Sequence, residues 1–114
     1  MIIISRSILY LLTGRFAESI ALWPFIFLSR VELKNDAILL NHERIHLRQQ
    51  VELLILIFYI WYILEYLIYR AKGINHYSAY RCISFEKEAY NHERDLQYLK
   101  TRKFYNFLVY LRSK

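Results

Sequence analysis

One long helical pattern limits how this chain can fold. Apolar residues recur at helical spacing from Asp36 to about Tyr69, and Asn35 or Asp36 is a suitable N-cap. At a rise of about 1.5 Å per residue, an unbroken helix of this length would extend for roughly 50 Å. The 114 residues suffice for one compact domain, and such a rod would project beyond it. We therefore expect a bend or break near residues 50–58.

The composition agrees with a mainly helical fold. The chain has 2 Gly and 1 Pro but 11 Tyr and 7 Phe, and 56% of its residues are hydrophobic. Few turn-forming residues favour long helices over a many-stranded sandwich, and the hydrophobic content excludes disorder. We predict a mainly α fold with a small β element (α+β), built as a single minimal domain over residues 1–114.

The N-terminal part carries two apolar runs separated by a turn signal. Residues 1–13 fit either a strand or a helix, and a Thr-Gly pair ends them. The run at residues 20–29 contains Pro24, which has no amide donor, so as a strand it belongs at a sheet edge. The first run contains Arg6 and lacks a small-residue cleavage pattern, so we expect no cleaved signal peptide.

The C-terminal part carries two further helix patterns. After a turn at residues 72–75, we expect a helix over residues 77–99 and a shorter one over 103–112. The net charge is +6, which fits a solvated basic face, an anionic lipid surface or nucleic acid. Since the aromatic residues lie within helix patterns and no nucleic-acid motif occurs, we expect no nucleic-acid partner. The basic residues of the last third include Lys100, Arg102, Lys103, Arg112 and Lys114.

Residues 53–69 form the most apolar segment of the chain. They are shorter than an ordinary membrane span and contain Glu65. On a helix, the tyrosines and glutamates fall on one half, and most of the Leu and Ile residues, with Trp61, fall on the other. We interpret the segment as a core helix whose second face meets polar partners or water; a membrane-embedded or membrane-lying helix is the alternative. With Cys82 as the single cysteine, we expect a cytoplasmic or inner-membrane-associated protein.

Residues 42–46, HERIH, fit the metal-binding pattern H-E-x-x-H on the predicted helix. Residues i and i+4 share one helix face, so His42 and His46 converge on a single ion. Glu43 is offset by one position, where it can reach a water molecule on that ion and accept its proton. Because Zn²⁺ lowers the pKa of such a water towards about 7, we expect a site for one Zn²⁺ with Glu43 as general base.

The tetrapeptide NHER occurs twice, at residues 41–44 and 91–94. In the second block a leucine stands where the second histidine is needed, and a single histidine cannot chelate an ion. We interpret this block as a partial repeat of the first that does not form a second zinc site, with His92 as an exposed helix residue. Asn41 and Asn91 are interpreted as polar helix positions without a special role.

A catalytic zinc ion typically has three protein ligands, so one remains to be found. Glu86 and Glu88 are candidates that point about 200° apart on a helix, and only one of them can face the ion. The residues that share a face with Glu86 are Ala89, Tyr90 and Glu93. The small Ala89 allows two helices to approach closely, so we choose Glu86 over Glu88. His76, in the turn before this helix, is a weaker candidate.

The HERIH motif and a downstream E-x-x-A that begins at Glu86 resemble the gluzincin metallopeptidases, in particular the branch with HtpX-like and CAAX prenyl proteases. The surrounding segments are also similar to small bacterial metallopeptidases. The resemblance implies a minimal zincin-like core, zinc on His42, His46 and Glu86, and Glu43 as general base.

Two positions depart from the pattern of that family. The residue four after the ligand glutamate is usually Asp, which supports a zinc-bound histidine, but here it is Tyr90. Its phenol can accept that hydrogen bond or donate one to an oxyanion, whereas the effect of a carboxylate on ligand basicity would be missing. Arg44 occupies an inner motif position where zincins favour uncharged residues.

Together these features predict zinc-dependent hydrolysis of a peptide or protein substrate. We expect the substrate to be held by strand addition along an edge strand within residues 20–29. Tyr90, another tyrosine or His92 would donate a hydrogen bond to the oxyanion. The alternative is a non-catalytic metal-binding or interaction protein, associated with a membrane surface through residues 53–69. The oligomeric state does not follow from the sequence.

Overall fold

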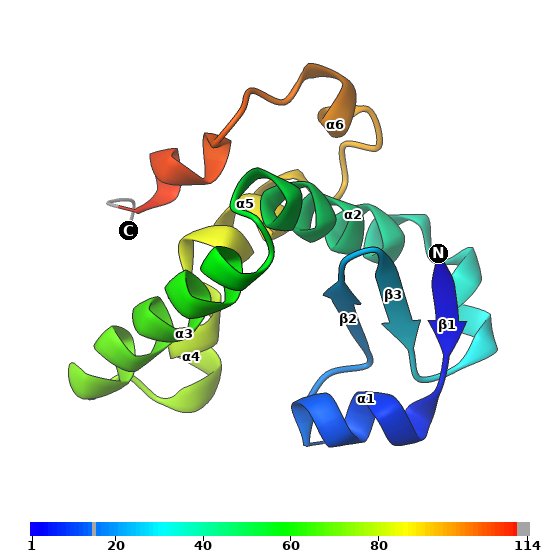
Figure 1. The fold of residues 1–114 in the computed structure, drawn as a ribbon, viewed down its shortest axis with the longest axis horizontal. Coiled ribbons are helices and arrows are strands. Elements are labelled where there is room, and N and C mark those ends of the chain that lie inside the picture. The colour runs from blue at the N-terminus through cyan, green and yellow to red at the C-terminus, as the bar shows by residue number, and fades with distance from the viewer. Residues whose placement is uncertain (15, 112–114) are drawn as a thin grey trace.

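The structure is a computed structural model that describes residues 1–14 and 16–111. It is mainly helical with a small three-stranded sheet (Figure 1), which confirms the predicted α+β class. In chain order the elements are β1 (Ile2–Ile4), α1 (Arg6–Thr13), β2 (Ser19–Leu22), β3 (Phe25–Leu28), the 3-10 helix η1 (Val31–Asn35), α2 (Ala37–Glu52), α3 (Leu56–Ala71), α4 (His76–Cys82), α5 (Ser84–His92), α6 (Tyr98–Thr101) and the 3-10 helix η2 (Asn106–Tyr110).

The sheet has the order β1-β3-β2, with β1 parallel and β2 antiparallel to β3. The run at residues 20–29, expected as one strand, is therefore a hairpin. Trp23 and Pro24 form its turn, since proline cannot donate to the ladder. The edge strand beside α2 is β2, and Figure 1 shows the sheet lying on one side of α2 with α3, α4 and α5 on the other.

The long helical pattern is interrupted between Glu52 and Leu56. This agrees with the break that we expected near residues 50–58 from its length. Asp36 caps α2 by accepting a hydrogen bond from the amide of Leu39 at 3.0 Å. Leu54 adopts a left-handed backbone with φ of 53°, and the chain bends by 112° between α2 and α3. Within the described residues, no single helix has the length and hydropathy of a membrane span, whereas the bent pair α2–α3 meets both criteria when taken together.

The helix expected over residues 77–99 is wrong, because the chain forms α4 and then α5. The break lies at Ile83, and Ser84 begins the new helix. The backbone amide and the hydroxyl of Ser84 both donate to the carboxylate of Glu65 on α3, at 2.7 and 2.5 Å. The cap of α5 is thus supplied by a residue distant in sequence, which local helix rules do not reveal.

The end of α5 is set by a side chain from α2. The amide of Asn41 donates to the backbone carbonyls of His92, Glu93 and Asp95, at 3.3, 2.8 and 3.0 Å. These carbonyls lie at the last residue of α5 and just after it, where helix groups lack internal partners. Asn41, interpreted from sequence as a position without a special role, therefore fastens α2 to α5.

The short helix expected over residues 103–112 is the 3-10 helix η2, and residue 112 lies outside the described residues. Its buried Phe107 packs against Phe85 of α5, with the ring centroids 4.6 Å apart. Phe58 of α3 completes this aromatic cluster, 4.5 Å from Phe85. The cluster holds α3, α5 and the C-terminal segment together.

The orientation of α3 is the reverse of the expected one. Its tyrosine and glutamate half faces the protein, where Phe58 and Glu65 are buried and the tyrosines are half-buried. Its aliphatic half is exposed, so the interpretation of α3 as a core helix with a buried aliphatic face is wrong. The physical reason is that a phenol can pack its ring and also donate a hydrogen bond inside the protein, which suits a polar site lined by rings.

Arg102 was expected among the basic residues of a surface that meets solvent, anionic lipid or nucleic acid, but its side chain is fully buried. It binds the carboxylate of Glu52 through two nitrogens, at 2.7 and 2.9 Å, and it also binds Glu88. Glu88 further accepts hydrogen bonds from Tyr98 and Gln49. Although burial opposes ionisation, these contacts hold the pKa of Glu88 below its usual value.

We predict that Arg102→Met destabilises the protein by about 3–5 kcal/mol, since it leaves two buried carboxylates without their cation. Urea unfolding of parent and variant measures the change in the free energy of unfolding. Lys103→Met is the matched control, because Lys103 is exposed and a surface change typically costs less than about 0.5 kcal/mol. Equal stability of the two variants would contradict the prediction.

Candidate metal centre

Two histidines of α2 and one glutamate of α5 converge in the interior. His42 Nε2, His46 Nε2 and Glu86 Oε1 lie 3.0–3.2 Å from one another, and all three residues are buried. Ile45 of α2 packs against the fully buried Ala89 of α5, which lets the two helices come close. The predicted trio therefore lies close enough together to hold a metal ion.

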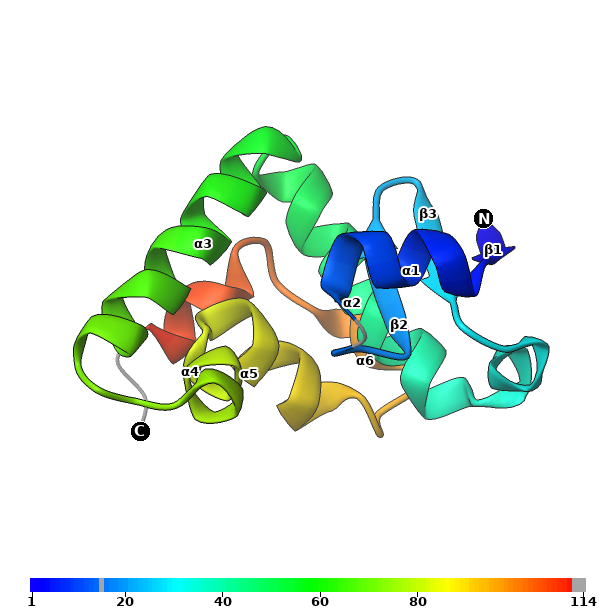
Figure 2. The ribbon, with the colours of Figure 1, turned by 90° about the horizontal axis from the view of Figure 1, so that it is seen from below.

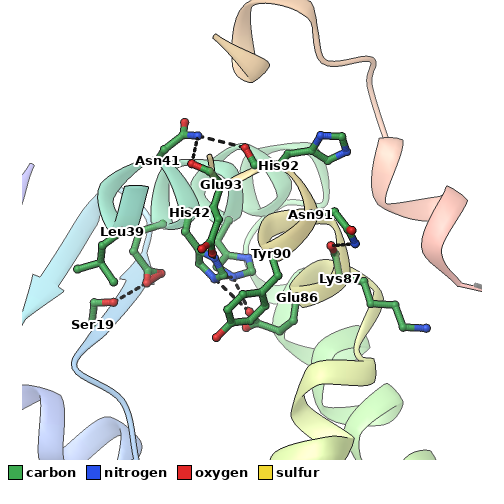
Figure 3. A network of polar contacts seen from close by, with 12 residues as sticks. Ser19, Leu39, Asn41, His42, Glu86, Lys87, Tyr90, Asn91, His92 and Glu93 are labelled. Carbon is green, nitrogen blue, oxygen red and sulfur yellow. Dashed lines mark hydrogen bonds and ion pairs between the residues drawn. The ribbon is translucent and has the colours of Figure 1, made fainter. Parts of the chain in front are cut away.

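The tautomer of His42 is fixed from its far side. His42 Nδ1 lies 2.7 Å from Glu93 Oε1 (Figure 3), and a carboxylate accepts hydrogen bonds only, so Nδ1 carries the proton. In the neutral ring Nε2 then presents a lone pair towards Glu86. Such a carboxylate behind a ligand histidine orients the ring and raises its basicity.

His46 is oriented in the same way by an amide. Its Nδ1 lies 2.8 Å from Gln49 Oε1. The amide nitrogen of Gln49 donates to the carbonyl of Phe85 and to Glu88, at 3.1 and 2.9 Å, so its oxygen is the atom that faces the ring. His46 Nδ1 is therefore the donor, and its Nε2 also points a lone pair at the site.

Three acceptor atoms that face one another require a cation. Burial lowers the pKa of His46, but the charge of Glu86 and a hydrogen bond to it outweigh this effect and raise the pKa from 6.5 to about 9. Burial likewise opposes ionisation of Glu86, yet the two histidines hold its pKa well below the usual range. A single proton can satisfy only part of this trio, whereas one metal ion satisfies all three atoms.

The choice of Glu86 over Glu88 agrees with this geometry. Glu88 is held by Arg102 and faces away from the histidine pair. The second oxygen of Glu86 accepts a hydrogen bond from the hydroxyl of Tyr62 at 2.6 Å. His76, the weaker candidate, is exposed, and its Nδ1 lies 2.7 Å from the hydroxyl of Tyr66.

The second NHER block contributes to the site, though through its glutamate. His92 points away from the trio (Figure 3); its ring stacks on Tyr98, and its Nε2 lies 2.8 Å from the hydroxyl of Tyr110. His92 is half-buried rather than exposed. Because Tyr90 stands where the gluzincin pattern has Asp, we expected no carboxylate beside the histidines. Glu93 supplies one, next to His42. The sequence feature that could have identified Glu93 is its position seven residues after Glu86, which places both on one helix face.

Tyr90 lies against the site with its ring instead of its hydroxyl. The ring meets the His42 ring edge to face, with centroids 4.4 Å apart, and the guanidinium of Arg81 lies 3.8 Å above it. Its hydroxyl lies 2.7 Å from the hydroxyl of Tyr80. Burial raises the pKa of Tyr80 and of Tyr90, so both phenols keep their protons at neutral pH. Sequence reasoning did not single out Tyr80.

Glu43 lines a cavity that the three residues of the candidate metal site also line. Its Oε2 accepts a hydrogen bond from the Ser19 hydroxyl of β2 at 2.7 Å, a contact drawn in Figure 3. Glu43, His42 and His46 line a cavity of about 370 Å³ that continues towards α1 and α3. A second cavity of about 450 Å³ shares Glu43, His42 and Tyr80 and extends towards Glu93. The site thus has room for a substrate on both sides of Glu43.

Comparisons with protein-family models, with curated proteins and with solved structures found no match. The resemblance to the gluzincins therefore stays a prediction that depends on two short motifs.

We predict that His42→Ala abolishes metal binding while His92→Ala, the corresponding change in the second NHER block, retains it. The first variant removes a converging nitrogen, and the second removes a ring that points elsewhere. Glu93→Gln should weaken metal affinity about tenfold to a hundredfold, because the ligand loses its orienting carboxylate. Elemental analysis and competition with a chelating dye measure these effects. Equal metal content in His42→Ala and in the parent would contradict the site.

Proposed function

We propose that this protein binds one Zn²⁺ through His42, His46 and Glu86 and hydrolyses peptide bonds with Glu43 as general base. The observation that carries the proposal is the convergence of two imidazole nitrogens and a carboxylate oxygen beside a cavity that Glu43 lines. A structural zinc site usually has four protein ligands, whereas three ligands beside a cavity leave one position for water.

The donor atoms and their spacing support zinc as the ion. Two nitrogens and one oxygen are a ligand set that zinc takes in hydrolytic enzymes. Atoms that bind a tetrahedral zinc ion at about 2.0–2.2 Å lie about 3.3–3.6 Å apart. The separations of 3.0–3.2 Å among His42, His46 and Glu86 are close to this range.

Glu43 is positioned to move the proton that hydrolysis requires. A bound Zn²⁺ supplies a Lewis acid that acidifies water and polarises the peptide carbonyl. Glu43 accepts a proton from the attacking water and passes it to the leaving amine. The Ser19 hydroxyl holds one carboxylate oxygen of Glu43, which leaves the other for the water.

The part of β2 that can pair with a peptide is shorter than the whole strand. The carbonyl of Ala21 on β2 accepts hydrogen bonds from Gln50 and Tyr59, both at 2.9 Å, and the amide of Trp23 donates to Gln50 at 2.7 Å. Strand addition is therefore limited to the part of β2 near Ser19, which lines both cavities. A peptide paired there passes Glu43 and extends into the cavity on each side.

The Tyr80–Tyr90 pair is the source of a hydrogen-bond donor to the oxyanion. Tyr80 lines both cavities, and its protonated hydroxyl can donate to a developing negative charge. Tyr90, bonded to that hydroxyl, positions it. His92 and Tyr59 do not suit this role, since His92 points away and Tyr59 donates to Ala21.

We predict that Glu43→Gln abolishes peptide hydrolysis and retains zinc, because it removes the proton acceptor without touching a ligand. Turnover of an unfolded protein or a peptide library, measured beside zinc content, checks this. Glu32→Gln, at an exposed position, is the control and should behave as the parent. If Glu43→Gln cleaves as fast as the parent, the mechanism is wrong. Stoichiometric zinc without any hydrolysis by the parent would favour the non-catalytic alternative.

A further inference from the structure

The outer face of α3 is a continuous aliphatic surface. Seven of its residues, all Leu or Ile, are 48–71% exposed, and they recur at the spacing of one helix face: Leu56, Ile57, Ile60, Ile63, Leu64, Leu67 and Ile68. Soluble proteins rarely expose an apolar patch of this extent without a partner. Every aromatic residue of α3 is buried or half-buried, so the exposed face carries no aromatic side chain.

A second aliphatic face, on α1, borders the cavity of about 370 Å³ that α3 also borders. Helix α1 exposes Ile8, Leu11 and Leu12, the last of which lines that cavity. On the opposite side Ile63 of α3 lines the same cavity and is 53% exposed. Figure 2 shows α1 and α3 on two sides of the molecule when it is viewed from below. Each of the two aliphatic faces therefore contributes a residue to the wall of the cavity that contains the candidate site.

The charges on these helices are of one sign at the exposed positions. In α1 and α3, which the structure describes in full, the one acidic residue is Glu65, and it is buried. Arg6 at the start of α1, Arg70 at the end of α3 and Lys72 just after it are exposed. An aliphatic surface bordered by cations matches an anionic lipid surface. A protein partner more often binds a surface rich in Trp, Tyr and Arg.

We propose that α1 and α3 lie on an anionic lipid bilayer, so that the entrance of the cavity faces the membrane. The aliphatic side chains enter the boundary between headgroups and acyl chains, and Arg6, Arg70 and Lys72 contact the lipid phosphates. The proposal does not depend on zinc or on hydrolysis, because none of these residues is a metal ligand.

The test compares two double substitutions that change the net charge equally. Ile60→Glu with Leu64→Glu places two carboxylates on the outer face of α3. Val31→Glu with Leu96→Glu does the same at exposed apolar positions outside α1 and α3. The full-length proteins are mixed with vesicles of equal parts phosphatidylcholine and phosphatidylglycerol and separated by flotation. Circular dichroism and thermal unfolding check that each variant folds.

The parent and the Val31/Leu96 variant should float with the vesicles, and the Ile60/Leu64 variant should partition about tenfold less or lower, since charge is costly in the acyl region. His46→Ala should float as the parent does, which separates this result from a failure of the metal site. A parent that stays unbound, or an Ile60/Leu64 variant that binds as the parent, would overturn the proposal. So would sedimentation showing a lipid-free dimer that the Ile60/Leu64 substitutions dissociate.

Discussion

The close contact between α2 and α5 is the constraint on which the rest of the structure depends. The side chain of Ile45 packs against Ala89, and the amide of Asn41 binds the backbone where α5 ends. Because each helix contributes atoms to the candidate metal site, a small displacement between them would separate the donor atoms. A side chain larger than Ala89 would push Glu86 away from the histidines, so packing and the geometry of the candidate site are linked at this point.

The parts of the site that sequence predicted are those set by local geometry. His42 and His46 follow from a spacing of one helical turn, and Asp36 follows from the rules of helix capping. The break after Glu52 follows from the size of the chain, since one straight helix does not fit in a compact domain. Glu86 follows from the smallness of Ala89 on the same face. Apart from the break, each of these inferences uses residues within two turns of one another.

The parts that sequence did not predict depend on residues far apart in the chain. Glu65 caps α5 across 19 positions, and Asn41 ends it across more than 50. Glu93 could be placed on the correct face, but only the packing of α5 against α2 brings it to His42. The face of α3 was assigned wrongly because amphipathicity shows that a helix has two sides without showing which side is buried. Hydrogen-bonding tyrosines around a polar site reversed the usual assignment.

The described part of the C-terminal segment, up to Leu111, contributes no atom to the trio of the candidate metal site, and it still supports that site. Arg102 holds Glu88, Glu88 accepts from the amide of Gln49, and the same amide orients His46. A fragment that stopped at the end of α5 would contain every atom of the candidate metal trio. It would lack the guanidinium of Arg102, which is the last member of this chain of hydrogen bonds. The smallest fragment that keeps these contacts is therefore longer than the stretch from His42 to Glu86. The segment around Arg102 is part of the scaffold of the site.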